Sequence, residues 1–370
     1  MSVILVAGAL ANKPQNGGGA WERLTWMAGL RRLGFDAVFV EQAVPGSAVD
    51  VEWFRSAVEF FGVDDRAALV STAGETVIGI AWPNLLDLAA TADLLINLSG
   101  HLTLPTIVDR IRRKAYVDVD PGFTQYWHAD PTTPFSLPKH DLYFTIGENI
   151  GRPGCPIPTG GIAWRPTRQP VILDDWPVVR VTPGRFTTIA SWRGPFGPIQ
   201  FGGRTLGLKV HEFRKYLDLP RRSLFEFEIA STIHPADVKD RAALVEHDWR
   251  LVDPLAAAGH PTAFRRYIQE SAAEFSVAQG VYVETNCGWF SDRSVRYLAS
   301  GKPVLVQDTG FGRWLPCGEG VVPFRTLDEA ATGAKRIVSD YSRHADAARA
   351  LAEEFFAAEK VIGRFLQDSL

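Results

Sequence analysis

The sequence contains few of the features that mark secreted, metal-bound or membrane proteins. It has only three cysteines, Cys155, Cys287 and Cys317, and no C-x-x-C pair. This pattern argues against a disulfide framework or a cysteine zinc site and favours a reducing compartment. No basic residues precede the first apolar run, and no apolar run approaches the ~20 residues needed to cross a membrane. We therefore predict a cytoplasmic protein with no membrane partner.

The sequence also lacks an excess of charge of either sign. The formal net charge is -3, and charged residues make up 22% of the chain. Because nucleic-acid binding normally requires a basic surface, we expect no nucleic-acid partner. The hydrophobic fraction of 46% is typical of a globular protein with a sizeable core. The length of 370 residues predicts two domains.

The dinucleotide fingerprint G-x-G-x-x-G is absent as well. A glycine run, Gly17-Gly18-Gly19, does follow the first apolar segment, but it lies well beyond the point where the fingerprint needs a tight turn. This disfavours a nicotinamide-dependent oxidoreductase. We interpret the run as a mobile loop that lines a cleft, and a plain linker is the alternative.

Apolar runs and amphipathic segments alternate in both halves of the chain. We predict strands at 3–7, 36–41, 93–98, 115–118, 142–145, 186–192, 224–229, 249–252, 277–284 and 303–306. We predict helices at 21–33, 51–61, 83–92, 106–114, 210–217, 262–274, 291–300, 327–338 and 345–366. This alternation predicts an α/β protein with parallel sheets and right-handed crossovers.

A proline-rich segment separates the two halves. Residues 151–183 contain seven prolines, which predicts a stiff and irregular connection. We therefore expect a first domain over residues 1–150, a linker over 151–183 and a second domain over 184–345. The remaining segment, 346–370, is expected to form a helix that can cross back to the first domain.

Polar side chains follow several predicted strands, at the edge where open α/β sheets bind ligands. In the first half, His101 or Asp120 could act as a general base for a hydroxyl. A loop histidine and a turn-forming Asp-Pro-Gly are the alternatives. In the second half, Arg193 and Lys209 suit a diphosphate, with two solvated cations as the alternative.

Residues 275–311 carry the most specific pattern. A predicted strand leads into a turn over residues 286–291, and Ser291 can cap a helix that ends at Gly301. Free backbone N–H groups and the helix dipole attract anions at such a helix start. This element predicts a phosphate-bearing ligand.

The turn is similar to a nucleotide-sugar signature. From Thr285 to Ser291, five of seven residues agree with the T-H-C-G-W-N-S core of plant secondary-product glycosyltransferases. With two α/β halves and a hinge, the chain resembles GT-B glycosyltransferases, including the actinobacterial small-molecule type. The resemblance implies two Rossmann-like domains with parallel sheets that face each other across a cleft.

The resemblance also implies roles for individual residues. Trp249 would stack on the nucleoside base, and Leu251 and Val252 would present backbone groups to a uracil edge. Asp308 lies where the family holds the sugar hydroxyls, and Thr309 and Gly310 follow it. The donor diphosphate would be bound by the turn and helix start together with the two cations: Asn286, Gly288, Trp289, Ser291, Ser294, Arg193 and Lys209.

The sequence departs from the family in ways that leave the reaction course open. Asn286 replaces the histidine of the plant turn, and the E-x7-E pair of retaining enzymes falls on Gly288 and Arg296. An inverting reaction would need His101 or Asp120 as base, whereas a retaining reaction would need none. Asp118 and Asp120 also spell D-x-D, the metal signature of another glycosyltransferase architecture. Because Asp120 enters a Pro-Gly turn, we expect no metal. We also expect no cofactor, since the nucleoside diphosphate sugar is a co-substrate.

The expected function is hexose transfer from a nucleoside diphosphate sugar, such as UDP-glucose, to a hydroxyl of a small-molecule acceptor. The acceptor would be a specialised metabolite or a nucleoside. The first domain would bind the acceptor and the second the donor. A nucleotide-sugar epimerase or hydrolase and a non-catalytic nucleotide-binding protein are the alternatives.

Overall fold

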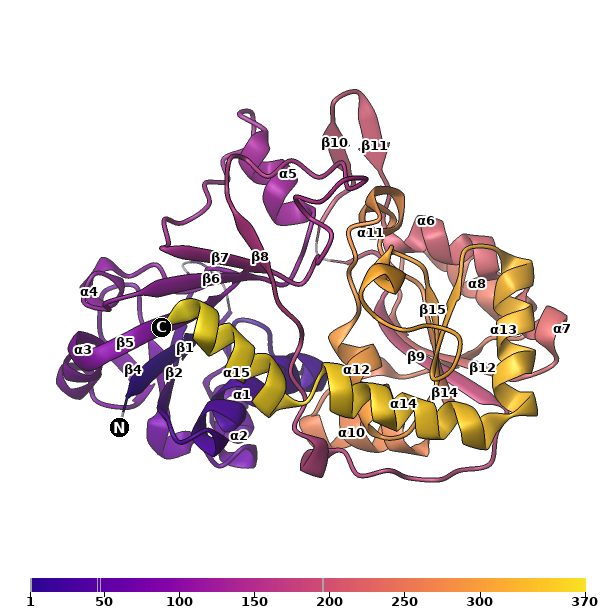
Figure 1. The fold of residues 1–370 in the computed structure, drawn as a ribbon, viewed down its shortest axis with the longest axis horizontal. Helices are drawn as coiled ribbons and strands as arrows, with labels where there is room; N and C mark the ends of the chain where they lie inside the picture. Colours follow the sequence, from indigo (N-terminus) through magenta and orange to yellow (C-terminus); the bar gives the residue numbers. More distant parts are fainter. Residues whose placement is uncertain (1, 45, 47, 195) are drawn as a thin grey trace.

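The computed structural model describes residues 2–44, 46, 48–194 and 196–370 and contains two parallel β-sheets (Figure 1). Within these residues the first sheet has the strand order β4-β3-β2-β1-β5-β6-β7-β8 and the second β13-β12-β9-β14-β15-β16. Neighbouring strands pair in parallel except for β3 with β4. Helices cover both sheets, so the predicted fold class of two Rossmann-like α/β units is confirmed.

The elements of the first unit come mostly from the first half of the chain. Its strands are β1 (Val3–Ala7), β2 (Asp36–Gln42), β3 (Ala67–Val70), β4 (Thr76–Gly79), β5 (Ala92–Leu98), β6 (Lys114–Asp118), β7 (Leu142–Thr145) and β8 (Trp164–Pro166). Its helices are α1 (Gly17–Arg32), α2 (Val51–Phe60), α3 (Trp82–Thr91), α4 (Pro105–Val108) and α5 (Phe123–Ala129).

The second unit adds a small antiparallel hairpin to its sheet. The sheet strands are β9 (Arg185–Ser191), β12 (Glu226–Thr232), β13 (Arg250–Val252), β14 (Ala273–Ser276), β15 (Val304–Gln307) and β16 (Val321–Phe324), and the hairpin is β10 (Ile199–Phe201) with β11 (Arg204–Leu206). The helices are α6 (Lys209–Phe213), α7 (Leu219–Ser223), α8 (Val238–Glu246), α9 (Pro254–Ala258), α10 (Pro261–Glu270), α11 (Gly280–Thr285), α12 (Asp292–Ala299), α13 (Leu327–Ser339) and α14 (Tyr341–Phe355). The last helix, α15 (Ala358–Ser369), returns to the first unit.

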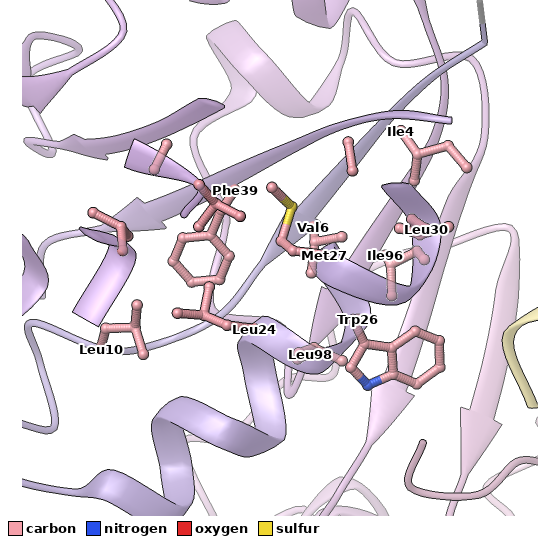
Figure 2. Close-up of a cluster of buried hydrophobic side chains, with 14 of the residues drawn as sticks. Ile4, Val6, Leu10, Leu24, Trp26, Met27, Leu30, Phe39, Ile96 and Leu98 are labelled. Carbon is pink, nitrogen blue, oxygen red and sulfur yellow. The ribbon is translucent and has the colours of Figure 1, made fainter. Parts of the chain in front are cut away.

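Strand β1 shows why the first sheet needs helices on both faces. Ile4 and Val6 pack with Leu24 and Met27 of α1 (Figure 2), whereas Leu5 packs on the opposite face in the cluster that includes α3. Successive side chains of a strand point to opposite faces of its sheet. A strand with apolar residues at every position must therefore be covered by helices on both faces of the sheet, as in other parallel sheets.

The C-terminal segment forms two helices rather than the single predicted one. Helices α14 and α15 are separated at Phe356 and Ala357, and Val171 forms a β-bridge with Ala357. Helix α15 packs beside α1, where Phe365 lies 5.1 Å from Trp26 and 4.3 Å from Phe144 between ring centroids (Figure 1, yellow). The end of the chain thus completes the core of the first sheet.

Several local predictions are wrong. The sequence predicts a strand at 277–284, but β14 ends at Ser276 and Gly280–Thr285 is helix α11. The predicted helix at 106–114 ends at Val108, and the predicted loop at Gly17 is the first turn of α1. Asn16 caps that turn by accepting a hydrogen bond of 2.8 Å from the Gly19 amide. Helix α5, the hairpin and strands β3, β4 and β16 are absent from the sequence-based prediction.

A joint centred on Asn149 connects the two units. The Asn149 side-chain amide donates to the carbonyl oxygens of Asn286, at 2.8 Å, and Gly310, at 3.0 Å. Its backbone amide donates to the Cys287 carbonyl at 2.9 Å. Gly288 and Gly310 have φ of 81° and 86°, and a Cβ on either would lie 2.9 Å from an Asn149 side-chain atom. Glycine is required at both positions because of backbone conformation and close approach.

Candidate active site

A cavity of about 460 Å³ lies between the two units. Loops that follow β1, β6, β7 and β9 contribute to its wall, so it sits at the carboxyl ends of strands from both sheets. The start of α1, the start of α6, helix α9 and the residues around the start of α12 complete the wall.

The wall from the second unit carries positive charge. Lys209, the first residue of α6, lines the cavity and makes no ion pair with any carboxylate of the described residues. Burial, followed by the nearby charge of Arg293, lowers the Lys209 pKa to about 7. Arg293 donates to Glu274 at 2.6 Å and to Ser276 Oγ at 2.7 Å. An anion placed here would meet one unpaired ammonium and one fixed guanidinium.

The start of α12 faces the same cavity. Ser291 caps the helix, and its hydroxyl oxygen accepts from the Arg293 amide at 3.3 Å. The first amides of a helix have no partners within the helix and carry the positive end of its dipole. The helix start therefore adds to the attraction for an anion near Lys209.

The wall from the first unit carries the carboxylate of Asp120. No donor in the described part of the chain hydrogen-bonds to that carboxylate, and burial raises its pKa while the charge of Lys13 opposes the increase. The turn is held by Asp118, which is fully buried. Asp118 accepts from the Asp120 amide at 3.1 Å and, each at 2.8 Å, from Thr124, Gln125 and Thr145 side chains.

A second carboxylate, Glu22, was missed by the sequence reasoning. It lies in α1, accepts from Gln169 Nε2 at 2.9 Å and from Arg23 Nη1 at 3.0 Å, and lines the cavity. Burial raises the pKa of the Glu22 carboxyl, and the Arg23 charge acts against this increase. No local signal distinguishes Glu22 from the other polar residues of α1, because Gln169 comes from a distant segment.

Solved structures share this two-unit arrangement over the whole chain. AviGT4, a glycosyltransferase involved in avilamycin A biosynthesis, is 13% identical with a TM-score of 0.59, covering 100% of this chain and 97% of that chain. An α-glucosyltransferase in complex with UDP and a 13-mer DNA is 10% identical with a TM-score of 0.62, covering 100% and 98%. Anabaena HepE in complex with UDP and glucose is 12% identical with a TM-score of 0.59, covering 100% of both chains.

The chain has the GT-B fold. No protein-family model matches the chain, and no curated protein matches it in sequence. Among the described residues, no helix is long and apolar enough to cross a membrane. In the same residues, no group of three or more His, Cys, Asp or Glu side chains is arranged to hold a metal ion.

The GT-B cavity brings together some of the residues expected from the sequence and leaves others outside. Those that line it are Gly18, Gly19, Asp120, Lys209, Trp289 and Ser291. His101 does not line it; burial lowers its pKa to about 3, and no described residue bonds to its buried Nε2. Arg193 points instead to Asp237, with Nε 2.8 Å from Oδ2. Ser294 is buried in α12, and Gly17 packs against the backbone of His260.

The expected nucleoside-binding and sugar-binding residues also lie away from the GT-B cavity. Trp249 is buried in the second core, where its indole N–H donates to the Leu217 carbonyl at 2.8 Å. Leu251 and Val252 lie within β13, and Pro254 and Leu255 of the following helix line the cavity instead. Asp308 pairs with Arg325 at 2.7 Å.

The turn at 286–288 faces the joint rather than the cavity. Asn286, Asp308 and Gly310 line a separate surface hollow, and Thr309 is buried. The Gly288 amide donates to the Thr309 carbonyl at 2.8 Å. The Asn149 side-chain amide donates to the Asn286 and Gly310 carbonyls. Within the predicted phosphate turn, Trp289 and Ser291 are thus the residues that line the cavity.

Proposed function

We propose that the protein transfers a hexose from a nucleoside diphosphate sugar, with UDP-glucose favoured, to a hydroxyl of a small-molecule acceptor. The observation that carries this proposal is the pairing of two opposed walls in one cavity. Lys209 and the start of α12 form one wall, and the Asp120 carboxylate lies on the other; within the described residues, Lys209 makes no ion pair and that carboxylate accepts no hydrogen bond. The presence of UDP in the HepE and α-glucosyltransferase structures supports the choice of donor.

The donor diphosphate would bind to the second unit. Lys209, Arg293 and the first amides of α12 would neutralise the charge that develops on the leaving diphosphate. Arg193 and Ser294, which the sequence suggested for this role, would support it only indirectly from their positions outside the cavity wall. Helix α9, with Pro254 and Leu255, offers an apolar edge for the nucleoside.

The acceptor hydroxyl would approach from the first unit. Asp120 would take the hydroxyl proton as the oxygen forms its bond to the anomeric carbon. The bond between that carbon and the diphosphate oxygen would break, and the diphosphate would leave with the electron pair. This course inverts the anomeric centre. In a retaining course the departing phosphate would take the proton instead and Asp120 would be dispensable.

A small acceptor suits the size and charge of the site. The cavity volume of about 460 Å³ leaves little room beyond a nucleotide sugar and a compact acceptor. The net charge of -3 gives no general attraction for a nucleic acid, although one similar structure contains DNA. An epimerase or hydrolase would use the same donor site without an acceptor, and a binding protein would not turn the donor over.

The test combines ligand binding with product analysis. UDP should raise the melting temperature more than AMP or NAD does, because a ligand that prefers the native state stabilises it. Transfer is then measured with UDP-glucose and an acceptor panel, and the anomeric configuration of the product is read by NMR. Absence of a shift with every nucleoside diphosphate would overturn the donor site. Turnover of UDP-glucose that never needs an acceptor would favour the epimerase or hydrolase.

A further inference from the structure

Glu22 is held in the cavity wall by two donors from different segments. Gln169, which belongs to the proline-rich connection and is only 4% exposed, donates to Oε1 at 2.9 Å. Arg23 donates to Oε2 at 3.0 Å and is itself fixed by a bond of 2.8 Å to the Gly19 carbonyl. The side chain of Glu22 retains 15% exposure. Each carboxylate oxygen therefore has one protein donor and a fixed orientation.

The protein leaves part of the hydrogen-bonding capacity of Glu22 unused. A carboxylate can accept about four hydrogen bonds, and the described residues supply the two from Gln169 and Arg23. A buried acceptor that is fully desolvated without further donors is unfavourable. A ligand that carries hydrogen-bond donors would replace the hydrogen bonds that Glu22 loses when water leaves the cavity.

The charges around Glu22 indicate what kind of donor fits. Its negative charge is opposed by Arg23, Lys13 and Arg296, while the carboxylates of Asp292 and Asp120 add negative charge nearby. Arg23 already gives Oε2 a cationic partner, so neutral donors can fill the remaining acceptor positions. Neutral hydroxyls fit better, and two adjacent hydroxyls of a sugar ring can donate to the two oxygens of one carboxylate.

We propose that Glu22 binds adjacent sugar hydroxyls of the donor and determines which donor is accepted. The inference rests on the proposed function, because the ligand is taken to be a nucleoside diphosphate sugar. Ribose and hexose both offer adjacent hydroxyls, so Glu22 could bind either sugar in the same way. The experiment below distinguishes the two sugars. Gln169 and Arg23 act as positioning residues that fix the carboxylate. Because Gln169 belongs to the connection between the units, the binding of the sugar by Glu22 depends on the relative placement of the two units.

The experiment measures dissociation constants by calorimetry for UDP, 2′,3′-dideoxy-UDP and UDP-glucose. The proteins are the wild type, Glu22→Gln and the surface control Glu59→Gln. If Glu22 binds the ribose, Glu22→Gln lowers the affinity for UDP about 10- to 100-fold and leaves the affinity for 2′,3′-dideoxy-UDP unchanged. If Glu22 binds the hexose, the affinity for UDP is unchanged and the affinity for UDP-glucose falls by the same factor. Glu59→Gln should match the wild type throughout.

A second variant separates positioning from folding. Gln169→Met removes a donor that fixes Glu22 but keeps the carboxylate, and should weaken binding of the same ligand about 3- to 10-fold at a temperature where the variant is still folded, as its melting curve shows. Equal affinities of wild type and Glu22→Gln for all three ligands would overturn the role of Glu22. Equal weakening of all three would overturn it as well, since the effect would not depend on hydroxyls. Failure of the wild type to bind any of them would instead overturn the proposed function.

Discussion

The backbone of Gly17 lies so close to His260 that a Cβ atom on Gly17 would be 2.4 Å from the His260 carbonyl oxygen. Gly17 begins α1 in the first unit, and His260 precedes α10 in the second. The indole N–H of Trp21 donates to the Pro261 carbonyl at 3.0 Å in the same contact. The start of α1 thus closes one edge of the cavity by direct packing between the units.

Gly17→Ala is expected to disturb this contact. The added methyl group meets backbone atoms that cannot rotate away, so we expect a loss of about 1–3 kcal/mol in the free energy of unfolding. UDP affinity should fall as well, because the neighbouring Gly18 and Gly19 line the cavity. Urea unfolding and calorimetry measure the two effects.

The matched control is Gly363→Ala. Gly363 lies in α15, and a methyl group added there would meet no atom of the described residues within 4 Å, so alanine should stabilise the helix by about 0.5–1 kcal/mol. Equal unfolding midpoints for Gly17→Ala and the wild type would contradict the close packing described between the units.

The charge of Lys209 should make UDP binding depend on pH. Because the Lys209 pKa is about 7, its side chain is charged below that pH and becomes neutral as pH rises. UDP affinity should therefore fall as pH rises from 7 to 9. Lys209→Met should bind UDP weakly at all these pH values. An identical pH dependence in both proteins would show that another group is responsible.

Lys209 should also affect the stability of the ligand-free protein. In the unfolded chain its pKa returns to about 10.4, so the unfolded state binds more protons between pH 7 and pH 10. The contribution of Lys209 to the free energy of unfolding is therefore most unfavourable below pH 7 and improves as pH rises. Lys209→Met should be more stable than the wild type at pH 6, with the difference shrinking toward pH 10. Urea unfolding across this range checks the sign.

Asp118 and Asp120 are two residues apart but should respond differently to the same substitution. Asp118→Asn places an amide N–H₂ among donors that already fill the site, and we expect a loss of about 3 kcal/mol in stability. Asp120→Asn should keep or raise stability at neutral pH, because burial disfavours its ionised form. It should retain UDP affinity and reduce transfer about 100- to 10,000-fold. Loss of UDP binding in Asp120→Asn would contradict the division of roles between the walls.

Asn149→Ala should weaken the joint between the units. It leaves the Asn286 and Gly310 carbonyls without the side-chain donor, and we expect about 2 kcal/mol lower stability. Asn149→Asp should be worse, because a carboxylate would face two carbonyl oxygens. Asn84→Ala on exposed α3 is the control and should change stability little. Hydrogen exchange at residues 286–288 should rise in the Asn149 variants alone.

The parts of the fold that the sequence predicts well are those set by local pattern. Strands such as β1 and β2 are continuous apolar runs between polar turns, and their bounds agree with the prediction to within a residue or so. Residues 277–284 fail because a short apolar run fits a buried helix as well as a buried strand. The helix also begins at a close contact that the sequence pattern does not reveal, because a Cβ on Gly280 would lie 2.7 Å from the Gly207 carbonyl oxygen.

The same distinction applies to the site. Asp120 follows strand β6, so the geometry of a parallel sheet places it at the ligand-binding edge of the first sheet, and Lys209 is recognised as a cation at a helix start in the second half. Glu22 and Gln169 meet only after two distant segments pack together, and no pattern in either segment predicts the contact. Trp249 shows the reverse: a tryptophan beside a strand can face a ligand or the core, and here the core surrounds it.

The joint at Asn149 has a consequence for how the sequence can evolve. Asn149 fits only because positions 288 and 310 carry no Cβ, and those glycines adopt their backbone conformation around its amide. A smaller side chain at 149 would not free either glycine, because φ stays positive and backbone atoms of Asn149 and Asn286 also lie within 3.0 Å of the added Cβ. Among related sequences that keep this joint, glycine should therefore be found at both positions, which lie up to about 160 residues from Asn149 in the chain.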